Sequence, residues 1–170
     1  MAAGSTYTPI ATTTLGSATN SVTFSSISGS YTDLVLVANL SATTTANIYF
    51  RVNGDTGNSY SFTMLSGDGA AANGYHGANT SSGTATWTGA SMQNTWTTCT
   101  AHFMKYSNTN TYKYFITNYA AYSSSGGSTE ASMAVNLYRS TSAIDSITVL
   151  SLSPNYVAGS TLTLYGITAA

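Results

Sequence analysis

Hydrophobic and polar residues alternate in two stretches near the middle of the chain, within residues 47–65. A period of two predicts a β-strand with one buried face. Between the stretches, residues 53–58 contain Gly54, Gly57, two Asn and one Asp, which tolerate positive φ and let the chain reverse. We therefore predict a β-hairpin with a bulged or extended turn. Its apolar side consists of Ile48, Phe50, Val52, Tyr60, Phe62 and Met64.

The same alternation recurs along the chain. Residues 31–40 and 144–152 are apolar on both sides, which predicts two central strands buried on both faces. Other strands are expected within residues 22–24, 84–88, 94–106, 112–122, 132–139 and 162–167. Nine to ten strands at short, regular spacing predict an all-β fold. The best match is a two-sheet antiparallel β-sandwich, jelly-roll-like, with an extended N-terminal arm.

Two segments stand apart from this pattern. Residues 1–20 are rich in Thr and Ser, and we expect an extended N-terminal arm or an edge strand, because Pro suits an edge. Residues 21–170 form a single β-sandwich domain by this interpretation. Within it, residues 66–83 are rich in Gly and Ala and predict a long loop that serves an interaction. The candidate assembly contacts of the arm are Tyr7, Pro9, Ile10 and Leu15.

Charge is the unusual feature of the composition. Charged residues make up 5% of the 170 residues, and the net charge is −1; ordinary globular proteins carry about 25%. Four scattered cations make no basic stripe, so we expect no nucleic-acid partner. No apolar run is long enough to predict a membrane span, and the first residues lack the pattern of a secretory signal. A neutral surface favours permanent assembly, because burying hydroxyls costs less than burying charges; the alternative is a stable β-protein that is simply neutral.

The sequence gives little sign of catalysis. Its five carboxylates, Asp33, Asp55, Asp68, Glu130 and Asp145, are scattered, and no motif pairs them. No nucleophile elbow, phosphate loop or metal-ligand cluster occurs, so we expect no enzyme activity, no metal and no cofactor. The single cysteine, Cys99, is expected to be a buried, inert thiol.

Aromatic and amide side chains raise a second possibility, a surface that binds sugars. The candidate glycan or partner contacts are Tyr75, His76, Trp87 and Tyr122. Trp96 is a further candidate, with the alternative that it belongs to an alternating strand and lies in the core.

Five segments together carry a family resemblance: YTPIATTTLGSA (7–18), VTFSSI (22–27), YTDLVLV (31–37), FRVNGD (50–55) and LYGI (164–167). This ensemble resembles small virion structural proteins of tailed bacteriophages, including phages of cyanobacteria. The likeness covers the first 65 residues or so and the last strand, whereas residues 66–139 match no known pattern.

The resemblance implies a non-enzymatic capsid decoration (cement) protein that bridges neighbouring capsomers. Its partners would be copies of itself, in a homotrimer, and the major capsid protein. Its location would be the virion, assembled in the host cytoplasm. The alternative that the resemblance leaves open is a tail or head fibre module that binds host surface glycans.

Overall fold

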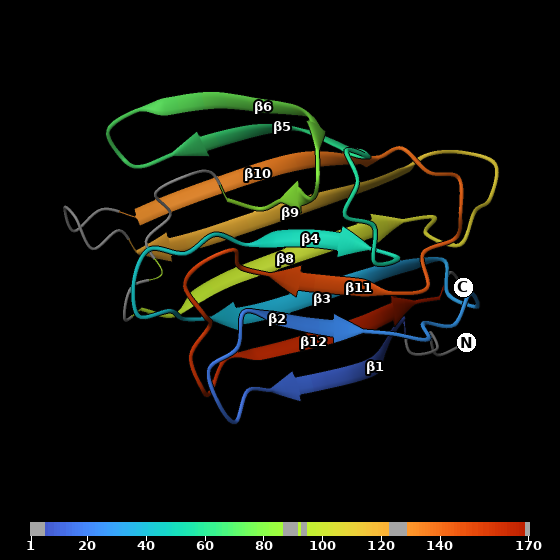
Figure 1. The fold of residues 1–170 in the computed structure, drawn as a ribbon, viewed down its shortest axis with the longest axis horizontal. Helices are drawn as coiled ribbons and strands as arrows, with labels where there is room; N and C mark the ends of the chain where they lie inside the picture. Colours follow the sequence, from blue (N-terminus) through green and yellow to red (C-terminus); the bar gives the residue numbers. More distant parts are fainter. Residues whose placement is uncertain (1–5, 87–91, 93–94, 123–128, 169–170) are drawn as a thin grey trace.

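The computed structural model describes residues 6–86, 92, 95–122 and 129–168. This part of the chain contains no helix and forms twelve strands in two antiparallel sheets (Figure 1). The strands are β1 (Tyr7–Thr14), β2 (Ser21–Phe24), β3 (Asp33–Leu40), β4 (Tyr49–Val52), β5 (Tyr60–Gly67), β6 (Ala72–Thr80), β7 (Gly83–Thr84), β8 (Thr97–Met104), β9 (Lys113–Tyr122), β10 (Thr129–Tyr138), β11 (Ile147–Leu150) and β12 (Thr161–Ile167). The all-β sandwich predicted from the alternation is therefore confirmed.

The two sheets have unequal sizes. The larger has the order β1-β12-β3-β8-β9-β10-β5-β6, and the smaller has the order β2-β11-β4-β7. If β5, β6, β9 and β10 are set aside, eight strands remain in two sheets of four, β1-β12-β3-β8 and β2-β11-β4-β7. Along the chain, these eight strands pass between the sheets in the order of a jelly roll. The chain is thus a jelly roll with two inserted strand pairs.

The inserted pairs lie side by side and extend the larger sheet beyond β8. We call these four strands, β9-β10-β5-β6, the wing (Figure 1). The ladders of β10 are continuous: β10 pairs with β9 from Thr129 to Tyr138 and with β5 from Ala131 to Tyr138. The wing therefore belongs to the same sheet as the jelly-roll frame, and its residues come from the middle of the sequence.

The core lies between the two sheets. On β3 every second side chain is fully buried, and the residues between them are partly exposed, because only one face of this sheet is covered. The two-sided burial expected for residues 31–40 is therefore wrong, although β3 is central in its sheet. Phe50, Phe103 and Phe115 form the aromatic centre, with ring centroids 4.7 to 6.3 Å apart.

The predicted hairpin within residues 47–65 is also wrong. Both stretches are strands with the expected faces buried, but β4 belongs to the smaller sheet and β5 to the larger. The chain crosses from one sheet to the other. Tyr60 joins Phe50 and Val52 in the main core, whereas Phe62 and Met64 pack in a separate small cluster. The Tyr60 hydroxyl connects the two strands, since it accepts a hydrogen bond from the Val52 amide at 3.0 Å.

Residues 66–83 are not the long loop that the glycines predict. They contain the end of β5, all of β6 and the first residue of β7. The Gly-rich composition is explained partly by close packing. A β-carbon at Gly77 would overlap the ring of Phe62 on β5, and one at Gly83 would overlap the ring of Phe115 on β9.

A buried polar cluster joins the wing to the smaller sheet. The side-chain amide of Asn136, on β10, accepts from the Thr84 amide N–H at 2.8 Å and donates to the Thr84 carbonyl at 3.0 Å. Thr117 Oγ1 donates to the same carbonyl at 2.9 Å, and Ser132 Oγ donates to the Ala85 carbonyl at 2.8 Å. Asn136 thus bonds β7 as a neighbouring strand would, through one donor and one acceptor.

Candidate binding surface

The outer face of the wing carries exposed apolar side chains. Leu65 on β5 and Met133 and Val135 on β10 are 62%, 47% and 43% exposed. The registers place Met133 beside Leu65, and Val135 beside Thr63. We call Leu65, Met133 and Val135 the apolar patch. Exposed aliphatic side chains side by side on a flat sheet are typical of a surface that meets another molecule.

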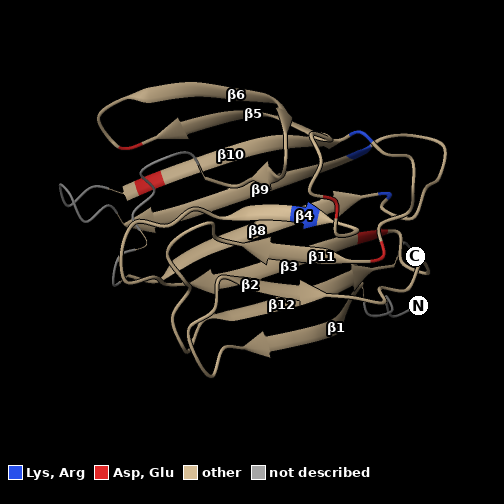
Figure 2. Ribbon diagram, viewed as in Figure 1, with Lys and Arg blue, Asp and Glu red and all other residues tan. Residues whose placement is uncertain are grey.

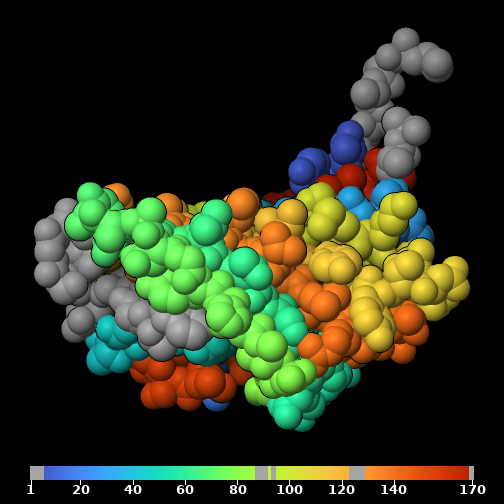
Figure 3. Space-filling model, turned by 90° about the horizontal axis from the view of Figure 1, so that it is seen from above, coloured from blue at the N-terminus to red at the C-terminus, as the bar shows by residue number. Residues whose placement is uncertain are grey.

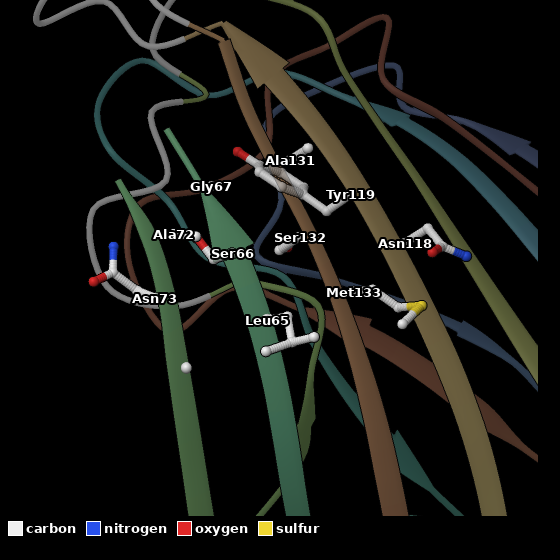
Figure 4. A pocket seen from close by; sticks show the side chains of 11 residues that line it. Leu65, Ser66, Gly67, Ala72, Asn73, Asn118, Tyr119, Ala131, Ser132 and Met133 are labelled. Carbon is white, nitrogen blue, oxygen red and sulfur yellow. The ribbon is translucent and has the colours of Figure 1, made fainter. Parts of the chain in front are cut away.

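Small residues make a hollow beside the apolar patch. Its volume is about 660 Å³, and Gly67, Ala72, Gly74 and Ala131 leave space next to Leu65. Figure 4 shows the side chains of Leu65, Met133 and Asn118 rising from three different strands around it. The surface therefore offers both protruding apolar side chains and a recess.

Few charges lie near this surface. Figure 2 shows that the charged residues of the wing lie towards the ends of its strands, leaving the middle uncharged. At the end where β10 begins, burial and then the nearby Asp68 carboxylate raise the pKa of Glu130. Asp68 itself has a lowered pKa, because its Oδ1 accepts the amide hydrogens of Ala71 and Ala70 at 2.8 and 2.9 Å. Asp68 thus holds the β5–β6 turn.

The candidate contacts of the N-terminal arm fall into two groups. Leu15 is buried in the core, and Ile10 packs against the core. Tyr7 is 54% exposed and Pro9 is exposed. Residues 7–14 form the edge strand β1, paired with β12 of the same chain. Ile10 and Leu15 therefore make internal contacts, and Tyr7 and Pro9 lie where a partner can reach them.

The candidate glycan contacts do not come together. Tyr75 is partly buried against a small cluster formed by Phe62, Met64 and Ala134. His76 is exposed on β6, and Tyr122 is exposed at the end of β9, with β5 and β10 between the two strands. Trp87 lies outside the described residues.

The structure also shows whether Trp96 and Cys99 are buried. Trp96 is 61% exposed and precedes β8, so the core position considered for it is wrong. Cys99 is fully buried, as predicted, and burial raises the pKa of its thiol to about 12.

Within residues 6–86, 92, 95–122 and 129–168, no group of three His, Cys, Asp or Glu is placed to hold a metal ion. The same ranges contain no helix long and apolar enough to cross a membrane.

Sequence reasoning missed the apolar patch for a specific reason. The apolar side of residues 132–139, with Met133, Val135 and Leu137, suggests a buried face by the usual rule. In the structure, the opposite side, with Ala134, Asn136 and Tyr138, faces inward. The signal in the sequence is that the second side also carries residues able to pack, Ala134 and Tyr138. A strand with packing residues on both sides can bury one face in the core and offer the other to a partner.

Comparison with protein-family models, with curated proteins and with solved structures found no match to this chain.

Proposed function

We propose that this chain is a non-enzymatic structural protein of a tailed-bacteriophage particle, which decorates the capsid and bridges neighbouring capsomers. The observation that carries the proposal is the exposed, uncharged apolar patch on the wing. The wing is inserted into a jelly-roll frame and comes largely from the part of the sequence that lies outside the resemblance. An inserted surface of this kind suits a specific protein partner, here the major capsid protein.

The size of the wing agrees with such a role. Four strands spaced about 4.8 Å apart and up to about ten residues long give a face of roughly 600 Å². A stable protein interface needs about 800 Å² on each partner. The wing would supply most of that area, and neighbouring strands of the same sheet would supply the rest.

The mechanism is additional buried surface. A protein that binds only the assembled shell stabilises it by mass action, without any chemical step. The few charges favour this role, because the apolar patch can be buried without removing an unpaired ion from water. A homotrimer, as the resemblance implies, would repeat the contact around a symmetry axis.

Copy number tests the proposal. We would purify particles of a phage that encodes this chain and quantify it against the major capsid protein by peptide mass spectrometry. We expect a stoichiometry comparable with that of the shell protein. A small fixed number per particle would move the chain to the tail or fibres. Absence from the particle would overturn the proposal.

A further inference from the structure

A second cavity lies at the other end of the wing from the β5–β6 turn. It has a volume of about 890 Å³ and is bordered by Asp33, Lys105, Asn110, Tyr112, Tyr114 and Thr141. Figure 3 shows the yellow β8–β9 turn and the orange segment after β10 beside one another at this end. None of its bordering residues belongs to the apolar patch. We propose that this cavity binds a neutral saccharide.

The cavity presents two aromatic side chains. Tyr112 and Tyr114 are 51% and 50% exposed and are two residues apart, which puts them about 7 Å apart along one strand direction. Both border the same cavity. Exposed tyrosine rings offer an apolar face for the C–H side of a sugar ring, and their hydroxyls offer hydrogen bonds.

The polar groups suit hydroxyl groups better than a phosphate. The Asp33 carboxylate accepts hydrogen bonds, the Lys105 ammonium donates them, and Asn110 and Thr141 do both. A sugar hydroxyl also donates and accepts, so it can use every member of this set. The opposite charges of Asp33 and Lys105 balance, and the carboxylate disfavours an anionic ligand.

The walls of the cavity are fixed before any ligand binds. Asp33 Oδ1 accepts from the Lys105 amide at 2.7 Å, and Asp33 Oδ2 is 3.0 Å from His102 Nε2. The bond to Asp33 fixes the amide of Lys105, whose φ of 46° is a left-handed conformation that is uncommon for lysine. Strained backbone held by its surroundings is a recurrent feature of binding sites.

A buried lysine, Lys113, joins the segment before β9 to the segment after β10, and both segments border the cavity. Lys113 is almost completely buried, and its Nζ donates to the carbonyls of Thr111 and Thr141 at 2.8 and 3.0 Å. The Asn108 side chain shapes the same turn, since its Oδ1 accepts from the Asn110 amide at 2.7 Å. A preformed site loses less conformational entropy on binding, which favours recognition of a small ligand.

The test is an NMR titration of the full chain with methyl glycosides of glucose, galactose, mannose and N-acetylglucosamine at millimolar concentration. We expect at least one of them to shift the amide resonances of residues 105–114 and 141. Tyr112→Ala should weaken this binding about tenfold or more. Tyr7→Ala is the control, because this tyrosine is similarly exposed, at 54%, but lies on β1 and does not border the cavity.

Any of three results would overturn the inference. One is a titration in which none of the four glycosides shifts residues 105–114. Another is equal weakening by Tyr112→Ala and Tyr7→Ala. Glucuronic acid and inorganic phosphate form a further arm, and tighter binding of either than of the neutral glycosides would refute the choice of a neutral ligand. The inference does not depend on the location of the chain in a particle.

Discussion

Asn136 shows how much one side chain can contribute to joining two sheets. It is fully buried and bonds both the N–H and the carbonyl of Thr84. β7 has only two residues, so this amide supplies much of the contact that keeps the strand in place. The Thr84 carbonyl has a second donor in Thr117, whereas the Thr84 N–H donates to the Asn136 side chain.

We therefore expect Asn136→Ala to lower the free energy of unfolding by about 2–4 kcal/mol, because it leaves a buried donor unpaired and opens a cavity. Urea denaturation measures this change. Ser132→Ala, which removes a single bond to the Ala85 carbonyl, should cost about 1 kcal/mol. Equal effects of the two substitutions would contradict the special role of Asn136.

Buried thiol and phenol groups make the fold sensitive to alkali. Burial raises the pKa of Cys99 from 9.0 to about 12, and it also raises the pKa values of Tyr60, Tyr119 and Tyr156. The folded chain keeps these protons at pH values where the unfolded chain loses them. Stability is therefore fully present below pH 9 and falls as pH rises from 9 towards 12, by up to about 1.4 kcal/mol per pH unit for each group.

The contribution of the thiol can be isolated between about pH 8 and about pH 10, before most phenols ionise. Cys99→Ala should flatten the loss of stability with pH in this window, as measured by urea denaturation. The contribution of Lys113 to stability rises with pH instead, because burial lowers its pKa. Lys113 is present in both the unaltered protein and the Cys99→Ala variant, so it does not affect their comparison. An unchanged slope in Cys99→Ala would show that the thiol is not the titrating group.

Among the strands, close packing of glycine against an aromatic ring recurs three times. Phe62 covers Gly77, Phe115 covers Gly83, and a β-carbon at Gly166 would overlap the ring of Tyr31. In each pair, the ring occupies the space that a side chain would take. Two of these glycines fall in the segment that composition alone assigns to a loop.

β6 offers a matched comparison of two glycines. Gly77→Ala should lower stability by about 1–3 kcal/mol, because the added methyl group displaces Phe62. Gly74→Ala should be neutral or stabilising by up to about 1 kcal/mol, since nothing lies within 4 Å of the added carbon and the unfolded chain loses freedom. Thermal unfolding of both variants tests this, and a larger loss for Gly74→Ala would refute it.

The same elements show what sequence can predict. Alternation located most strands and their buried sides, because the period of two depends on local geometry alone. Alternation could not assign strand partners. The pattern around Phe50 and Met64 is the same whether their two strands share one sheet or lie in different sheets. The sequence shows that Tyr112 and Tyr114 are two residues apart in a polar region. It does not show their cavity, because the cavity is completed by Asp33, which is distant along the chain.

For the whole molecule, the apolar patch should be necessary for attachment and unnecessary for folding. We expect Met133→Lys combined with Val135→Lys to reduce binding to purified particles about tenfold or more, because lysines would be buried without partners. Co-sedimentation with particles measures binding, and the urea midpoint measures folding.

Leu152→Lys is the control for added charge on an exposed apolar side chain. Leu152 is 67% exposed and follows β11, in the smaller sheet. This variant should bind particles like the unaltered chain. Loss of binding in both variants, or in neither, would mean that the wing is not the attachment surface.

The pairing of β1 with β12 has a practical consequence. It brings the first and last described residues together, and the Thr168 amide donates to the Thr6 carbonyl at 3.2 Å (Figure 1). A cargo attached next to Thr6 or Thr168 would leave from the same corner of the molecule. A short peptide linker could join Thr168 to Thr6, and new ends opened in the exposed turn at Gly54 would give a permuted chain that keeps every described strand. The fold is therefore a natural scaffold for displaying a second protein from a single point.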